Sequence, residues 1–175
     1  MKLKTNFHAN RPSNSSDELG RKNTCAGEMT VSKLTIAAEY LNRAIELYFR
    51  GDAYFSALHL AGAAQELLGK FVERTGEVSA HTSIVEGAVR ISAYLNENGK
   101  PSTDKQIRAV VNHAKNRAKH MDSVGDEVVY FDAQAAARDM LDLAVSEFNQ
   151  LWASGADLDL SAEIDRYNSY QATRS

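Results

Sequence analysis

Apolar side chains recur along this chain at intervals of three and four residues, which is the spacing of one face of an α-helix. The first segment of this kind covers residues 32–50, begins with a serine that can cap a helix, and is followed by a glycine. Its apolar positions are spaced 4, 3, 4 and 3 residues apart, at Leu34, Ala38, Leu41, Ile45 and Tyr48. This pattern predicts a helix that buries one face against its neighbours.

Two further segments with this spacing follow in the first half of the chain. Residues 52–74 are rich in alanine, and small side chains let a neighbouring helix approach closely. Asp52 is expected to cap this helix. The next segment, residues 83–98, repeats the spacing 4, 3 and 4 and stops before a Gly-Lys-Pro sequence. Its apolar positions are Ile84, Ala88, Ile91 and Leu95.

Two more helices are predicted in the second half of the chain. Thr103 followed by Gln106 forms a capping box that starts a basic helix over residues 106–121. An aspartate caps a longer helix over residues 132–153, and residues 123–131 between them are predicted as a loop with one extended arm. The inward positions of the longer helix are Ala137, Met140, Leu141, Ala144, Phe148 and Leu151.

The chain is expected to form one domain with a tail at each end. Residues 1–28 are rich in Asn, Ser, Lys and Arg and show no apolar period, so they are predicted to be disordered. Residues 29–155 are predicted as the helical domain, and residues 156–175 as a polar C-terminal tail with a short helix at 161–167. A second interpretation takes Met29 as the natural start and residues 1–28 as a mis-assigned extension.

The composition supports a single all-α domain. The chain has 175 residues, of which 43% are apolar and 25% charged, and this length suffices for one hydrophobic core. Two prolines and many residues of high helix propensity favour helices over strands. We therefore predict an up-and-down helical bundle of about five helices.

Net charge and cysteine content indicate the surroundings of the protein. A net charge of −3 at pH 7 gives no general attraction to nucleic acid or to anionic membranes. Cys25 is the single cysteine and cannot form a disulfide within the chain, which fits a reducing compartment. No apolar run reaches the roughly 20 residues of a membrane span, and the first residues contain no signal-peptide core. The sequence predicts a cytoplasmic protein without membrane contact.

The predicted basic helix over residues 106–121 is the one whose polar face suggests chemistry. Its apolar positions are expected to face inward, at Ile107, Val110, Val111, Ala114, Ala118 and Met121. One flank carries polar side chains at positions i, i+3, i+4 and i+7, where helical side chains can act together. These are His113, Asn116, Arg117 and His120. The residues expected to bind an anion are Arg108, His113, Arg117 and Lys119.

Several common kinds of site are disfavoured. His113 and His120 would lie about 10.5 Å apart along a helix, whereas a zinc–nitrogen bond is about 2 Å, so one ion cannot bind both. The chain contains no Glu-x-x-His pair of the kind that di-iron bundles use. No serine lies in a glycine-flanked nucleophile elbow, and the ten glycines form no phosphate-binding loop. We expect no metal and no cofactor.

The sequence Lys-Asn-Arg-Ala-Lys-His at residues 115–120 resembles the Arg-Asn-x-x-x-His signature of HEPN domains, small helical bundles of prokaryotic toxin–antitoxin and other defence systems. Residues 41–69 also resemble such domains, with paired helices around a Gly-Asp turn. The resemblance implies metal-independent RNA cleavage by 2′-hydroxyl attack, with Arg and His of two protomers facing each other. Asn116 and His120 match by position, whereas Lys115 stands where arginine is expected.

Lysine keeps the charge of arginine but lacks the planar group that holds a phosphate through two hydrogen bonds. The resemblance therefore implies a non-catalytic HEPN-like bundle that binds RNA, a nucleotide or a protein partner such as an antitoxin. A homodimer is expected, joined through the face of the basic helix.

Two alternatives remain. One is a weak metal-independent ribonuclease whose catalytic residues are His120, Asn116 and Lys115, with the frame from Arg108 to His113 ranked below it. The other is a structural interaction module, in which the basic side chains only complement the negative end of the helix dipole.

Overall fold

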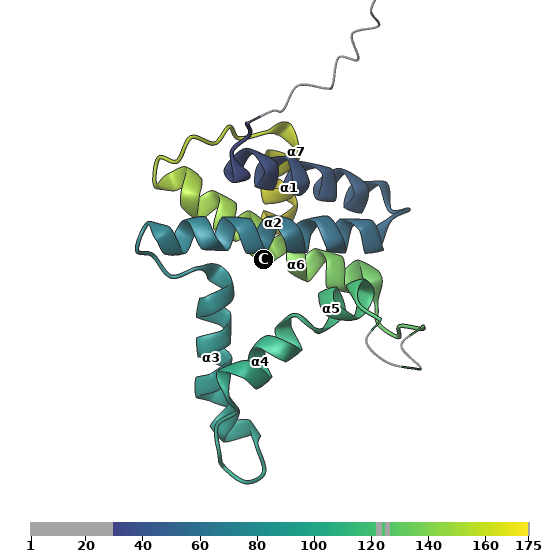
Figure 1. Ribbon diagram of the computed structural model, residues 1–175, viewed down its shortest axis with the longest axis vertical. Helices are drawn as coiled ribbons and strands as arrows, with labels where there is room; N and C mark the ends of the chain where they lie inside the picture. The colour runs from purple at the N-terminus through teal and green to yellow at the C-terminus, as the bar shows by residue number, and fades with distance from the viewer. Residues whose placement is uncertain (1–29, 122–123, 125–126, 175) are drawn as a thin grey trace, which may run out of the picture. The chain divides into compact units, whose positions relative to one another are not determined.

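The structure, a computed structural model, describes residues 30–121, 124 and 127–174. All the helices below belong to the unit Val31–Ser175. The predicted tail over residues 1–28, with Cys25, and the alternative start at Met29 lie outside the described residues. The described residues form seven α-helices and no strand, which confirms the all-α class (Figure 1). The helices are α1 (Lys33–Arg50), α2 (Tyr54–Arg74), α3 (Ala80–Leu95), α4 (Asp104–Val111), α5 (His113–Lys119), α6 (Ala133–Ala153) and α7 (Ala162–Ala172).

A tight turn joins α1 to α2. Ser32 caps α1 as predicted, and Gly51 ends it at φ 79°, in the left-handed region that favours glycine. The predicted cap of α2 is wrong, because this helix starts after Ala53 with no side-chain cap. The carboxylate of Asp52 instead accepts a hydrogen bond from Arg50 Nη2 at 2.7 Å.

The hydrophobic core lies where α1, α2 and α6 pack against one another (Figure 1). Ala57, Ala61 and Ala64 on α2 are fully buried, so small side chains do allow the neighbouring helices to approach closely. Asp132 caps α6 as predicted, since its carboxylate accepts from the Ala135 N–H at 3.0 Å. The six inward positions predicted for α6 are all buried.

The C-terminal segment contributes to this core. α7 is longer than the short helix predicted over residues 161–167, and it packs against α1 and α6. Ile164 and Tyr167 are fully buried, and the hydroxyl of Tyr167 donates to Asp142 Oδ1 at 2.8 Å. Residues 156–175 are therefore more than a polar tail.

The predicted basic helix over residues 106–121 is two helices that meet at Asn112. α4 begins at the predicted capping box of Thr103 and Gln106. Asn112 lies at φ −93° and ψ 5°, in the bridge region between helix and strand. Its side-chain Nδ2 donates to the Arg108 carbonyl oxygen at 3.0 Å, a local bond of the kind that competes with helix continuation. The described residues therefore form seven helices, because the predicted basic helix is two helices and the short C-terminal helix adds to the predicted bundle of about five.

The break also changes which side chains of this segment are buried. Val111 and Ala114 pack against the core as predicted, and Ile107 is partly buried. Lys115 is buried as well, at 7% exposure. The prediction of an inward face is wrong for three residues that are exposed, namely Val110, Ala118 and Met121.

α3 starts earlier than predicted and turns its apolar stripe outward. Ser79 caps the helix, and the side chains buried along it are His81, Val85 and Ser92. Figure 1 shows α3 leaving the end of α2, with α4 lying beside it on the way to α5. Contacts with α4 and α6 therefore use a different face of α3 from the one that its apolar spacing indicates.

Two smaller expectations concern loops and membranes. In the predicted loop over residues 123–131, the described positions contain no strand. Within the described part of the chain, none of the helices combines the length and the apolar character that crossing a membrane needs.

Candidate functional site

A polar cleft of about 440 Å³ opens where α2, α3, α4 and α5 meet. The turn of the chain at Asn112 places α5 against α2 and so closes one side of this cleft. Four of the polar side chains that line it are buried: Gln65, Ser79, His81 and Lys115. The remaining polar lining residues are Glu66, Lys70, Glu73, Arg108 and Asn112.

Lys115 reaches the cleft by lying across α2 at Gly62. A Cβ atom at residue 62 would lie 2.4 Å from Lys115 Cδ, so any larger residue there would force the lysine stem to shift. The apolar stem is thereby buried, and Lys115 Nζ donates to Glu66 Oε1 at 2.7 Å. The Glu66 side chain is 58% exposed and that of Lys115 is 8% exposed, so packing holds the cation more firmly than its partner.

Lys115 and Arg108 place two cations near His81 in the cleft. Burial lowers the pKa of His81, and the charges of Arg108 and Lys115 lower it further. At Glu66, burial raises the pKa, but the hydrogen bond and the charge of Lys115 outweigh burial and lower the pKa overall. Near neutral pH the cleft therefore holds a neutral imidazole, the three cations Lys70, Arg108 and Lys115, and the two carboxylates Glu66 and Glu73.

His81 contacts hydrogen-bonding groups through both ring nitrogens. Its Nδ1 lies 3.3 Å from Arg108 Nη1, and its Nε2 lies 3.3 Å from Asn112 Nδ2. A guanidinium only donates, so Nδ1 accepts and the proton of the neutral ring is on Nε2. Asn112 Oδ1 is buried without a hydrogen-bond partner, and Asn112 Nδ2 already donates to the Arg108 carbonyl oxygen. Arg108, His81 and Asn112 thus lie next to one another along the cleft.

Glu147 lies behind the cleft on α6 and is fully buried. Its Oε1 accepts from Gln65 Nε2 at 3.1 Å and from the His81 backbone N–H at 3.3 Å. A Cβ atom at Gly69 would lie 2.9 Å from Glu147 Oε2, so α2 and α6 approach closely here. Burial raises the pKa of Glu147 to about 7, although its hydrogen bonds act in the opposite direction. Glu147 thus connects α2, α3 and α6 beneath the cleft.

Of the residues predicted from the basic segment, the cleft contains Lys115 and Arg108. His113 lines an apolar groove bounded by α3, α4, α5 and α6 instead. Arg117 is partly buried on α5. Asn116, Lys119 and His120 are exposed, on α5 or directly after it, and line no part of the cleft. The structure therefore brings together two of the seven predicted residues and leaves the others outside the cleft.

Sequence reasoning did not identify His81, Asn112 or Glu66 as site residues. The sequence does hold a local signal for His81, namely Ser79, which can cap a helix. A helix predicted to start after Ser79 would have had His81 in its first turn. Gly62 inside an alanine-rich helix is a similar signal, because an interior glycine often marks a close approach. The pairing of Glu66 with a lysine on α5 has no local signal.

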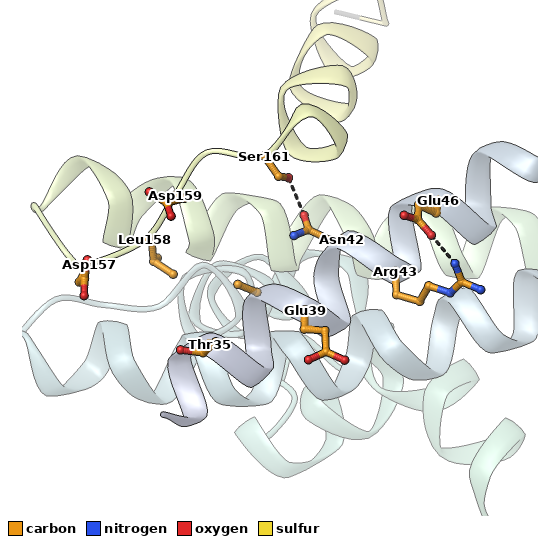
Figure 2. A pocket seen from close by; sticks show the side chains of 10 residues that line it. Thr35, Glu39, Asn42, Arg43, Glu46, Asp157, Leu158, Asp159 and Ser161 are labelled. Atoms are coloured by element: carbon orange, nitrogen blue, oxygen red, sulfur yellow. Dashed lines mark hydrogen bonds and ion pairs between the residues drawn. The ribbon is translucent and has the colours of Figure 1, made fainter. Parts of the chain in front are cut away.

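A second hollow, of about 640 Å³, lies between α1 and the segment that precedes α7 (Figure 2). Ser161 Oγ donates to Asn42 Oδ1 at 2.6 Å and holds this segment against α1. On its edge Arg43 pairs with Glu46. None of its lining residues is buried. It is open surface, which makes the cleft with its four buried polar side chains the better candidate.

Among the described residues, no three His, Cys, Asp or Glu side chains are grouped so as to hold a metal ion. Comparison of the chain with protein-family models, curated proteins and solved structures finds no match. The case for a function is therefore made from the cleft.

Proposed function

We propose that this chain is a non-catalytic, HEPN-like binding protein whose cleft holds a phosphate group of RNA or of a nucleotide. The observation that carries this proposal is the buried Lys115, whose ammonium lies in a cleft with Arg108 and pairs with an exposed carboxylate. A phosphate oxygen can take the place of the Glu66 carboxylate, since both are anionic acceptors for an ammonium group. Releasing Glu66 into water costs little, because ion pairs with an exposed partner contribute little stability.

Arg108 supplies the planar group that Lys115 lacks. Its Nε donates to Asp104 Oδ1 at 2.7 Å, and its Nη1 lies 3.3 Å from His81 Nδ1. A guanidinium has five N–H donors, so others remain for a ligand in the cleft. Lys115 and Arg108 together offer a phosphate one point charge and one fork of donors.

The preference for a non-catalytic protein is supported by the arrangement of the motif on α5. His120 follows Lys115 by five residues, about 140° around a helix. Lys115 is buried against α2, whereas His120 is exposed after the end of α5. Lys115 and His120 of one chain therefore lie apart, and a ribonuclease that used both side chains would need a second protomer.

Calorimetric titration with AMP and with a short oligouridylate tests the proposal. Arg108→Ala and Lys115→Ala are each expected to weaken binding by about tenfold or more, since a hydrogen bond to a charged group contributes about 1.5–3 kcal/mol. Glu66→Gln is expected to strengthen binding by a factor of a few, because it removes the carboxylate that competes with the ligand. Comparing the two ligands distinguishes a nucleotide from an RNA as the source of the phosphate.

Lys119→Ala is the matched control, because it removes the same charge from an exposed position of α5 outside the cleft. It should leave the affinity close to that of the wild type. Equal losses for Lys119→Ala and Lys115→Ala would contradict a site in the cleft. Chelator-resistant RNA cleavage that His120→Ala abolishes would favour the ribonuclease alternative, and no binding at all would favour the structural module.

A further inference from the structure

α3 carries an apolar stripe that the described part of the chain leaves uncovered. Ile84, Ile91 and Leu95 are 50%, 56% and 76% exposed, with Ala88 between them. Val110 on α4 is also exposed, and together with Ile84 it lines an apolar groove of about 500 Å³ that α5 and α6 complete. Contiguous exposed apolar side chains of this kind mark a surface that another molecule covers.

The stripe has the same spacing in both directions along α3. Its positions are 4, 3 and 4 residues apart, so a two-fold axis at its centre maps the stripe onto itself when two α3 helices pack antiparallel. Ile84 then meets Leu95 of the second copy, and Ala88 meets Ile91. At the centre a small side chain faces a large one, which allows the helices to approach closely. This symmetry fits a second copy of the chain better than an unrelated partner.

The charges at the two ends of this surface are also complementary. The groove beside Ile84 has two carboxylates among its lining residues: Asp132, which caps α6, and Asp139, which is ion-paired with Arg138 at 2.8 Å. At the other end of the α3–α4 pair, Lys100 and Lys105 are exposed, and Glu97 is the exposed glutamate beside them. The aspartate of α4, Asp104, is ion-paired with Arg108 of the same helix. An antiparallel arrangement brings this end of each copy to the groove of the other, where unlike charges attract.

We propose that the α3 stripe is the interface between two copies of this chain, packed antiparallel with α3 against α3. The interface rests on a different helix from the basic face through which the sequence predicts a homodimer. It does not depend on the phosphate cleft, since none of the stripe residues lines that cleft.

Sedimentation equilibrium of the full chain at micromolar concentration tests this interface. The wild type is expected to have twice the 19.2 kDa mass of the chain. Ile91→Glu places a charge at the centre of the interface and should raise the dissociation constant by about tenfold or more. Leu160→Glu is the control, because this leucine is 42% exposed in the segment before α7. It should remain dimeric.

A purely monomeric wild type, or an Ile91→Glu variant that dimerises as tightly as the wild type, would overturn the proposal. Far-UV circular dichroism checks that the variants fold, and Leu95→Lys provides a second interface variant if Ile91→Glu does not.

The antiparallel register has its own test in a Cys25→Ser background. A mixture of Ile84→Cys and Leu95→Cys chains should form a covalent dimer with a short bismaleimide, whereas each variant alone should crosslink poorly. Crosslinking of each variant with itself and not with the other would indicate a parallel arrangement and contradict the proposal.

Discussion

Replacing Glu147 by glutamine is expected to remove a loss of stability that the wild-type protein undergoes between about pH 4.5 and pH 7. Burial raises the pKa of Glu147 from 4.5 to about 7, so in this interval the folded protein holds a proton that the unfolded chain releases. The free energy of unfolding therefore falls as pH rises through the interval. The loss amounts to about 3 kcal/mol, by order of magnitude. Glutamine keeps the shape and an acceptor for Gln65 and carries no charge at any pH.

Urea unfolding of the wild type and of Glu147→Gln from pH 4 to pH 8 measures this effect. His81 acts in the opposite direction, since burial and the charge of Arg108 lower its pKa and stability is lost as pH falls below 6.5. The difference between the two proteins, rather than either curve, therefore isolates Glu147. The variant should gain stability relative to the wild type as pH rises, whereas the control Glu77→Gln, at an exposed position, should follow the wild type. A constant difference at every pH would contradict a raised pKa at Glu147.

Tyr167→Ala is expected to cost about 3–5 kcal/mol, because it removes a fully buried aromatic ring and leaves a cavity. The ring of Tyr167 packs against Tyr48 and Phe49 of α1, with centroids 6.2 and 6.0 Å apart. Tyr167→Phe keeps the ring but loses the hydrogen bond to Asp142, and a loss of about 1–3 kcal/mol is expected.

Urea unfolding measures both changes at Tyr167. Tyr130→Ala is the matched control, since Tyr130 is 92% exposed and its removal should change stability by less than about 0.5 kcal/mol. An unchanged stability for Tyr167→Ala would mean that α7 behaves as the polar tail that the sequence predicts.

Much of the helical structure could be predicted because its signals are local. The caps at Ser32 and Asp132 and the box at Thr103 are read from a few neighbouring residues, and all three are confirmed. The buried face of α6 is also as predicted, since this helix packs in the core and its apolar period reports that packing directly.

The apolar period was misleading where a helix has two faces to cover. On α3 the regular stripe is exposed, and the buried face includes His81 and Ser92, whose polar groups form hydrogen bonds with neighbouring elements. A regular spacing of apolar residues shows that one face of a helix is apolar, but it does not show which element or molecule covers that face. If the stripe packs against a second copy, the sequence signal reports the assembly and not the single chain.

The candidate site could be predicted in part for a related reason. Arg108 and Lys115 were identified from the charge of the basic segment, and both line the cleft. Their neighbours His81 and Glu66 come from α3 and α2, and the turn at Asn112 decides that these helices meet there. Such contacts between distant segments depend on tertiary packing, which a local pattern does not encode.

NMR titration of the protein with inorganic phosphate and with AMP tests the central claim, a phosphate site in the cleft, most directly. The imidazole signal of His81 and the side-chain amide signals of Asn112 are expected to shift along one saturable curve. The imidazole signals of His113 and His120, which lie outside the cleft, should stay in place at constant pH. Shifts of His113 and His120 without a shift of His81 would place the anion on the flank of α5 and contradict the account.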